Sequence, residues 1–112
     1  MPLKHSRHQL TEEEYLQGEL DSEVKHEYVD GEVYAMAGAS KNHERIAGNV
    51  YRKIGNFLEN STCEPFSSDV KVKAGNNFCY PDVMVVCDDN TDNEYYTESP
   101  TIIVEVLSQS TR

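Results

Sequence analysis

The sequence has few basic residues, and this shortage argues against one broad class of protein, those that bind polyanions through a general basic surface. Ten residues are Lys or Arg and 20 are Asp or Glu, which gives a formal charge of −10. Because Lys and Arg dominate affinity for nucleic acids by neutralising phosphates, this balance argues against a general polyanion-binding surface. It does not exclude a nuclease, since a bound metal ion reverses the sign of the local field.

Long apolar runs and closely spaced Cys-x-x-Cys motifs are also missing from the sequence. No stretch approaches the roughly 18 consecutive apolar residues of a membrane span, and the polar residues 1–8 lack the features of a secretory signal. We therefore expect no membrane partner. Cys63, Cys79 and Cys87 are odd in number and contain no Cys-x-x-Cys pair. This usage predicts reduced thiols in a cytoplasmic protein.

The remaining composition is that of one globular domain. Hydrophobic residues make up 38% of the chain and charged residues 27%, which is too apolar for a disordered segment. A chain of 112 residues can bury one core but has no room for a second. We therefore expect a single domain over residues 1–112.

Cap and turn signals predict the first elements. Thr11 begins a Thr-x-x-Glu capping box, which predicts a short helix to about Gly18. Asp30-Gly31 is a strong hairpin turn signal and predicts paired strands at 25–30 and 32–37.

A long amphipathic helix is predicted over residues 41–59, with Ser40 as its N-cap. His43 projects with the apolar face. An inward histidine is more often a hydrogen-bonded core residue, but it can also face a site at the sheet. The opposite face carries a basic stripe, which is either a solvated surface or the place where a phosphate backbone passes. The stripe consists of Lys41, Arg45 and Arg52.

Three further strands complete the expected fold. Residues 66–73 and 78–87 are predicted to pair through the turn-rich link at 74–77, and residues 101–108 form a last strand buried on both faces. The economical arrangement is an α/β fold, in which a mixed β-sheet has the long helix packed on one face.

Two carboxylates interrupt these apolar strands. Glu105 is bracketed by apolar residues, and Asp82 follows Pro81 at the start of another apolar run. A buried carboxylate usually shifts its pKa, pairs or binds a metal, and Mg²⁺ takes one or two protein carboxylates plus water. The alternatives are a strand-end turn for Asp82 and a buried ion pair for Glu105.

Several motifs, in order along nearly the whole chain, are similar to those of one nuclease family. The sequence resembles the Uma-two type of restriction endonuclease, within the PD-(D/E)XK nuclease superfamily. The matching blocks are Glu27-Tyr28-Val29-Asp30-Gly31-Glu32, Met36-Ala37-Gly38-Ala39-Ser40-x-x-His43, Ser68-Asp69-Val70-Lys71-Val72, Tyr80-Pro81-Asp82-Val83-Met84-Val85-Val86 and Ile103-Val104-Glu105-Val106-Leu107-Ser108-x-Ser110-Thr111.

The resemblance implies a restriction-endonuclease-like fold and a Mg²⁺- or Mn²⁺-dependent hydrolysis of DNA phosphodiester bonds. By matching positions, Asp82 and Glu105 would be the metal ligands, with the Val106 carbonyl as a third. Glu32 and His43 would be secondary residues of the same catalytic site.

The sequence departs from the family in two places. Leu107 stands where the superfamily has a lysine, two residues after the acid. The family usually supplies that lysine from a helix that would follow Arg112. We therefore expect a nuclease-like domain that lacks the family's C-terminal helix and strand and has an incomplete site, with Lys71 or Lys73 as substitutes for the lysine.

A second hypothesis is a catalytically dead interaction module. The acids would then survive as structural pairs, and the exposed last strand would drive self-association into a homodimer.

Overall fold

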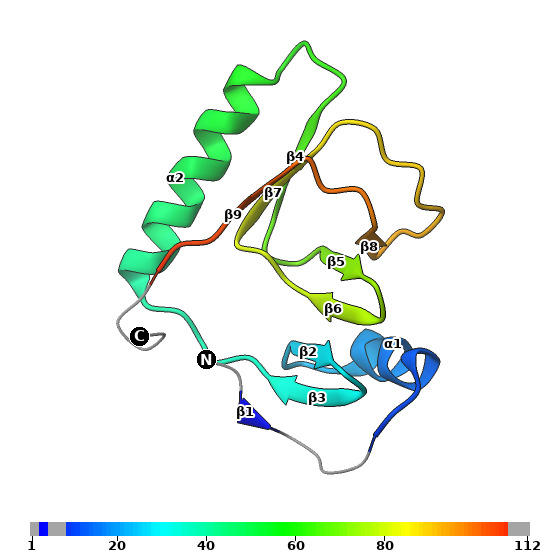
Figure 1. Cartoon of the computed structure of the whole chain (residues 1–112). Coiled ribbons are helices and arrows are strands. Elements are labelled where there is room, and N and C mark those ends of the chain that lie inside the picture. Colours follow the sequence, from blue (N-terminus) through cyan, green and yellow to red (C-terminus); the bar gives the residue numbers. More distant parts are fainter. Residues whose placement is uncertain (1–2, 5–8, 108–112) are drawn as a thin grey trace. The chain divides into compact units, whose positions relative to one another are not determined.

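The computed structural model describes residues 3–4 and 9–107. It has a mixed α/β fold with two sheets and one long helix, as the sequence predicts (Figure 1). Within the described ranges, no helix is long and apolar enough to cross a membrane. The chain forms two compact units, a first unit of Met1–Gly38 with Lys73–Cys79 and a second unit of Ala39–Val72 with Tyr80–Arg112.

Helix α1 (Glu12–Asp21) belongs to the first unit and begins at the predicted capping box. The Thr11 hydroxyl accepts a hydrogen bond from the Glu14 N–H at 3.1 Å, and Glu14 Oε1 accepts one from the Thr11 N–H at 2.8 Å. These bonds satisfy two backbone donors that the first turn leaves unpaired. The helix extends three residues beyond the predicted end at Gly18.

The predicted hairpin is present in the first unit. Asp30 and Gly31 have φ of 52° and 83°, the left-handed conformation that a primed two-residue turn requires at both central positions. The strands of this unit lie in the order β1-β3-β2-β6. Their bounds are Leu3–Lys4 for β1, His26–Val29 for β2, Glu32–Ala35 for β3 and Asn77–Cys79 for β6.

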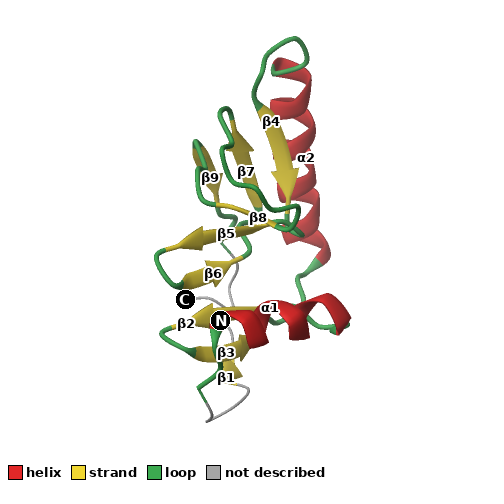
Figure 2. Cartoon of the chain, turned by 90° about the vertical axis from the view of Figure 1, so that its right-hand side faces the viewer, coloured by secondary structure: helices red, strands yellow, loops and turns green. Residues whose placement is uncertain are grey.

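Aromatic rings form the core of the first unit. Phe78 is fully buried, and the Tyr15 ring centroid lies 4.9 Å from that of Tyr28 and 5.5 Å from that of Phe78. The Tyr15 hydroxyl donates to the His26 carbonyl, so the polar end of this buried ring is satisfied. Helix α1 is thereby fixed to the hairpin (Figure 2).

Helix α2 (Lys41–Phe57) belongs to the second unit and begins after the predicted cap Ser40. It packs on β4 (Glu64–Ser67) and β7 (Val83–Val86). The contact confirms that the long helix covers one face of a sheet. No residue of α2 is fully buried.

Strand β7 is the centre of a three-stranded antiparallel sheet with the order β4-β7-β9. All four of its residues are buried. At the edge lies β9 (Ile102–Val104), where Ile102 is 53% exposed. The prediction of a last strand buried on both faces is therefore wrong, because among the described residues β9 has a neighbour on one side only.

The expected pairing of 66–73 with 78–87 is confirmed, but each range divides into two strands. A turn separates β4 from β5 (Lys71–Ala74), and residues around Pro81 separate β6 from β7. Proline lacks the N–H that a continuous strand would use. As a result β4 pairs with β7, while β5 lies beside β6. The sequence did not predict β8 (Tyr96–Thr97), which pairs in parallel with the start of β5.

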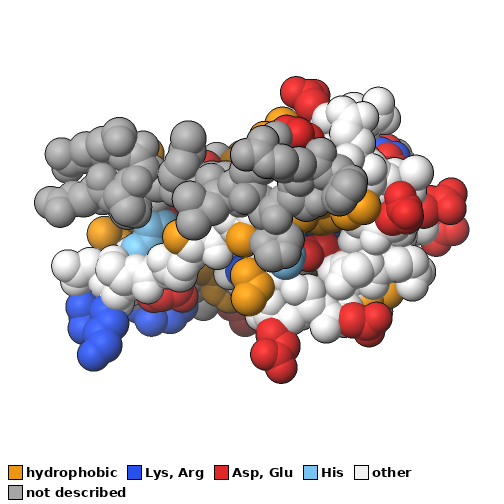
Figure 3. All heavy atoms as spheres, turned by 90° about the horizontal axis from the view of Figure 1, so that it is seen from below, with side chains coloured by type: hydrophobic (Ala, Val, Ile, Leu, Met, Phe, Trp, Pro, Cys, Tyr) orange, Lys and Arg blue, Asp and Glu red, His pale blue; other side chains and the backbone are white. Residues whose placement is uncertain are grey.

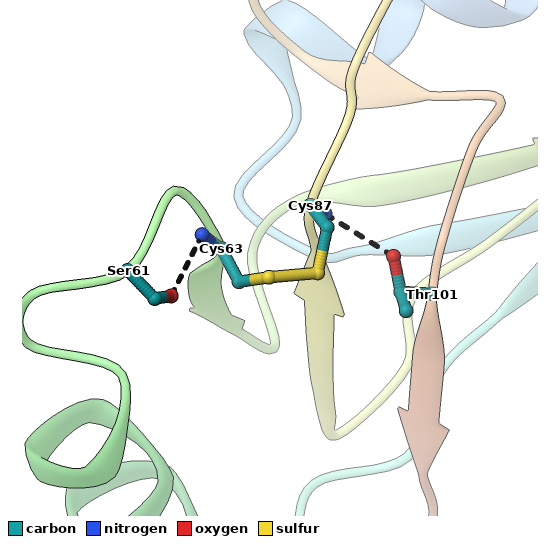
Figure 4. The surroundings of a disulfide bond; sticks show 4 residues. All are labelled: Ser61, Cys63, Cys87 and Thr101. Carbon is teal, nitrogen blue, oxygen red and sulfur yellow. Dashed lines mark hydrogen bonds between the residues drawn. A yellow bond between two sulfur atoms is a disulfide. The ribbon is translucent and has the colours of Figure 1, made fainter.

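Cys63 and Cys87 form a disulfide, contrary to the expectation of reduced thiols (Figure 4). Glu64 pairs with Val86 in the β4–β7 ladder, so the two cysteines occupy the next opposed positions. The Ser61 hydroxyl accepts from the Cys63 N–H at 2.9 Å, and the Thr101 hydroxyl accepts from the Cys87 N–H at 3.1 Å. Strand pairing brings together residues 24 positions apart. The cytoplasmic location stays a prediction.

Candidate functional site

Asp82 lies where β7 begins, directly after Pro81. Pro81 is fully buried, and the Asp82 side chain is 18% exposed. The carboxylate is therefore partly withdrawn from water at the mouth of a buried strand. An ionised carboxylate in this setting needs compensation from hydrogen bonds, a cation or both.

Two donors converge on one oxygen of this carboxylate. Oδ2 of Asp82 accepts from the Val106 N–H at 2.7 Å and lies 3.2 Å from Nε2 of His43. Within the described part of the chain, Oδ1 accepts no hydrogen bond. The Asp82 carboxylate is thus held through Oδ2, and Oδ1 is the oxygen that is available to bind a further group.

His43 reaches this carboxylate from the first turn of α2. The Ser40 hydroxyl accepts from the His43 N–H at 3.1 Å, and the His43 side chain is 13% exposed. For His43 to donate to an ionised Asp82, Nε2 must carry the proton. Nδ1 is buried without a hydrogen-bond partner among the described residues and lies 3.9 Å from Glu44 Oε1. His43 therefore points toward the start of β7 and is hydrogen-bonded there, which fits both alternatives that the sequence left open.

Glu105 follows β9 and is exposed, so its expected burial is wrong. Val83 pairs with Val104 in the β7–β9 ladder. One further step of this register sets Asp82 opposite Glu105. Directly opposed residues of an antiparallel pair project on the same face, with Cβ atoms about 4.5–5.5 Å apart. The two predicted metal ligands therefore stand at matching strand ends.

Glu32 lies in the first unit, at the start of β3. Its Oε2 accepts a hydrogen bond from the Tyr34 hydroxyl at 3.1 Å. This contact gives Glu32 a local structural role, and its catalytic role stays a prediction.

The two lysines considered as substitutes have other contacts. Lys71 is buried, with Nζ 5.2 Å from the centroid of the Tyr80 ring. Lys73 Nζ lies 3.2 Å from Glu12 Oε2 in the first unit. Asp82 forms no ion pair with either lysine.

The donor set of this region fits a hard cation better than a soft one. Among the described residues there is no cluster of three or more His, Cys, Asp or Glu that could hold a metal ion. Such a cluster is the usual requirement of zinc, whereas Mg²⁺ keeps several waters and needs one or two carboxylates. Oδ1 of Asp82 with the Glu105 carboxylate fits that smaller requirement.

Sequence reasoning did not identify the Val106 N–H as a donor to Asp82. It named the carbonyl of the same residue as a ligand, and that role stays a prediction. No local signal could have revealed the N–H contact, because it depends on how β7 and β9 pair.

The model of one protein family matches residues 12–112 and carries the description "Uma2: Putative restriction endonuclease". Two relatives come from Synechocystis sp. and are named uncharacterized proteins. The first, slr1290, is 44% identical over 106 residues, which are 91% of this chain and 55% of that protein. The second, sll1609, is 38% identical over 106 residues, or 90% of this chain and 60% of that protein.

A solved structure is also similar. It is the crystal structure of "a putative nuclease belonging to DUF820" from Anabaena variabilis, with a TM-score of 0.74 and 18% sequence identity. The match covers 90% of this chain and 60% of that one, and at this identity it shows the fold alone. The chain spans little more than half the length of the relatives it matches.

Proposed function

Because the chain belongs to the Uma2 family, described as "Putative restriction endonuclease", we propose that it is a metal-dependent DNA endonuclease domain. The reaction is hydrolysis of a phosphodiester bond. The observation that carries the proposal is the state of Asp82, which has Oδ2 held by two donors and Oδ1 without a hydrogen bond among the described residues. A carboxylate fixed in this way is prepared to bind a cation.

Asp82 and Glu105 would hold Mg²⁺ or Mn²⁺, with the Val106 carbonyl as a third ligand. When bound, the ion supplies a more acidic water and offsets charge on the scissile phosphate. The Val106 N–H fixes the Asp82 carboxylate relative to the end of β9. A catalytic role of Glu32 is proposed on the family motif alone.

His43 acts in this proposal as a positioning residue. While its Nε2–H donates to Asp82, that proton is committed to orienting the carboxylate. Since outer hydrogen bonds of this kind hold a metal ligand in one rotamer, the histidine fixes the direction in which Oδ1 points.

Leu107 limits the rate that we expect from the 112-residue chain. It stands where the superfamily has a charge-stabilising lysine. One preorganised electrostatic group contributes about 3–4 kcal/mol to a transition state. We therefore expect metal binding that is easily measured and DNA cleavage that is slow.

Isothermal titration of Mn²⁺ into the intact chain tests the proposal, with nicking of supercoiled plasmid as the second readout. We expect one site in the wild-type chain, and its loss in Asp82→Asn. Asp92→Asn is the matched control, because it makes the same charge change in an exposed loop. If Asp82→Asn binds Mn²⁺ like the wild-type chain, the proposed site is wrong.

The edge strand β9 favours a second candidate function, a self-associating module without catalytic activity. Ile102 and Ile103 are 53% and 46% exposed on a strand with one described neighbour. Open apolar edges favour pairing with another chain. Light scattering after gel filtration would show a homodimer that Ile103→Lys converts to a monomer. A monomeric wild-type chain would contradict this candidate.

A further inference from the structure

Helix α2 differs in charge from the rest of the chain. Four of its residues are basic and one is acidic, which gives a formal charge of +3 in a chain whose total is −10. An anionic partner is repelled by most of this protein. It can approach favourably only where the basic residues gather.

Three of these residues form the basic stripe predicted from the sequence. At about 100° per residue, Lys41, Arg45 and Arg52 fall within roughly 40° of one another around the helix. All three side chains are exposed, and among the described residues none lies within ion-pair distance of a carboxylate. Figure 3 shows Lys and Arg side chains gathered over the start of α2. The positive charge is therefore not neutralised within the described part of the chain.

Both arginines of the basic stripe are held by asparagines. Arg45 Nη1 donates to Asn42 Oδ1 at 2.8 Å, and Arg52 Nη2 donates to Asn49 Oδ1 at 2.7 Å. Each asparagine precedes its arginine by three residues. One bond of this kind uses part of the guanidinium fork and leaves the other N–H groups for a ligand. Because each arginine is already partly ordered, less side-chain entropy is lost when it binds.

The two Asn–Arg pairs repeat after seven residues, which corresponds to about 10.5 Å along the helix. Along each strand of duplex DNA a phosphate follows for every rise of about 3.4 Å along the axis. The two guanidinium groups are therefore far enough apart to contact separate phosphates. A guanidinium fork matches phosphate oxygens better than an ammonium does.

We propose that the basic stripe of α2 binds the phosphate backbone of duplex DNA. The inference rests on the proposed function in that DNA is the substrate. It adds the surface through which the substrate is held. His43 lies in the first turn of the same helix but on its opposite face, so the stripe would hold a part of the duplex away from the candidate site.

Binding of a fluorescein-labelled duplex, measured by anisotropy in EDTA over a series of KCl concentrations, tests the stripe without metal or cleavage. Each phosphate contact contributes about 0.9 to the slope of log affinity against log salt. Arg45→Gln/Arg52→Gln is expected to weaken binding at least about tenfold and to reduce that slope by about 2.

Lys53→Glu is the matched control because it changes the net charge by the same amount and lies exposed on the same helix. Lys53 is about 100° around the helix from the stripe. We therefore expect Lys53→Glu to lose much less than half of the DNA affinity that Arg45→Gln/Arg52→Gln loses. An equal loss in both variants would overturn the proposal, as would a wild-type chain that does not bind the duplex. Circular dichroism of each variant confirms that α2 is intact.

Asp82→Asn separates this inference from the metal proposal. In EDTA the variant should bind DNA as tightly as the wild-type chain or more tightly, because it removes a negative charge. Loss of Mn²⁺ binding with DNA binding unchanged supports both proposals. If Asp82→Asn binds Mn²⁺ normally while Arg45→Gln/Arg52→Gln weakens DNA binding, the metal site is overturned and DNA binding by the stripe is supported.

Discussion

His43 Nε2 and Asp82 Oδ2 lie 3.2 Å apart and join the first turn of α2 to the start of β7. The two residues are 39 positions apart in the chain. Their contact links the capped first turn of α2 to the candidate metal ligand. Substitutions at the start of α2 should therefore change how the Asp82 carboxylate is oriented.

His43→Ala should lower Mn²⁺ affinity by about 10- to 100-fold, the usual effect of removing a hydrogen-bond partner of a metal ligand. The reason is that Asp82 keeps its charge but loses one of the two donors that orient it. Calorimetry with Mn²⁺ measures the change.

His43→Gln provides a partial rescue, since its amide can still donate to the carboxylate. Glu44→Gln is the control for altered charge at the same turn, because Glu44 is exposed beside His43. Equal Mn²⁺ affinity in His43→Ala and the wild-type chain would mean that this contact does not position Asp82.

Ser40→Ala should lower the free energy of unfolding by about 1 kcal/mol, the typical cost of losing an N-cap. The Ser40 hydroxyl accepts from the His43 N–H, so the substitution leaves that donor without its partner. Urea denaturation followed by circular dichroism measures the loss. Ser40→Asp should restore stability, because aspartate is an equally good cap and favours the positive end of the helix dipole. A loss in both variants would point to another cause.

Reduction of the Cys63–Cys87 disulfide should lower the free energy of unfolding by about 3 kcal/mol, the value expected for a closed loop of this length. Denaturant midpoints with and without reductant measure the difference. Cys63→Ala/Cys87→Ala should match the reduced chain and should not respond to reductant. Cys79→Ala is the control, because Cys79 is outside the disulfide. A reductant effect that persists in the double variant would contradict the assignment.

Thr97→Val should raise the pKa of Asp89. Burial raises the pKa of this carboxyl. Hydrogen bonds from the Thr91 backbone and from the hydroxyls of Thr97 and Thr91 together lower the pKa by more than burial raises it, so it lies below its usual value of 3.8. Because the folded pKa is depressed, the stability gained from this carboxylate is present above about pH 4 and lost as pH falls through the folded pKa.

A carbon-13 NMR titration of the Asp89 carboxyl measures this shift directly. The Thr97 hydroxyl donates to Asp89 Oδ1 at 3.0 Å, whereas the Thr101 hydroxyl serves Cys87. Thr101→Val is therefore the control. An Asp89 pKa that is the same in Thr97→Val and in the wild-type chain would show that the hydroxyl contributes nothing to it.

Signals that depend on neighbours in sequence predicted the local structure well. Thr11 and Ser40 cap their helices, and Asp30-Gly31 forms the hairpin turn, because each motif is completed within about four residues. The inward direction of His43 followed from helical periodicity in the same way.

The pairing of 66–73 with 78–87 was predicted from the turn-rich link between them, but its division between two sheets was not. The chain around Pro81 leaves one sheet and enters another, so β4 pairs with β7 in one sheet while β5 lies beside β6 in the other. The disulfide follows from the β4–β7 register at Cys63, which lies before the predicted start of the first strand at residue 66.

The structure brings together His43 and Asp82, two of the residues named from the sequence, but their contacts were not predictable. Asp82 stands out because it follows proline at the mouth of an apolar strand. The apolar residues around Glu105 indicated burial, yet this part of the chain lies beyond an edge strand and is exposed. Apolar character alone cannot distinguish a central strand from an edge strand, since both present the same pattern.

The Cys63–Cys87 bond makes the backbone between them a covalently closed ring. The ring includes Asp82 and the excursion through Lys73–Cys79, which belongs to the first unit. A protease that cuts once at the exposed turn around Gly75 would therefore leave both fragments attached to each other. The nicked protein would migrate as one species on a denaturing gel until thiol is added, and only then separate into an N-terminal and a C-terminal piece.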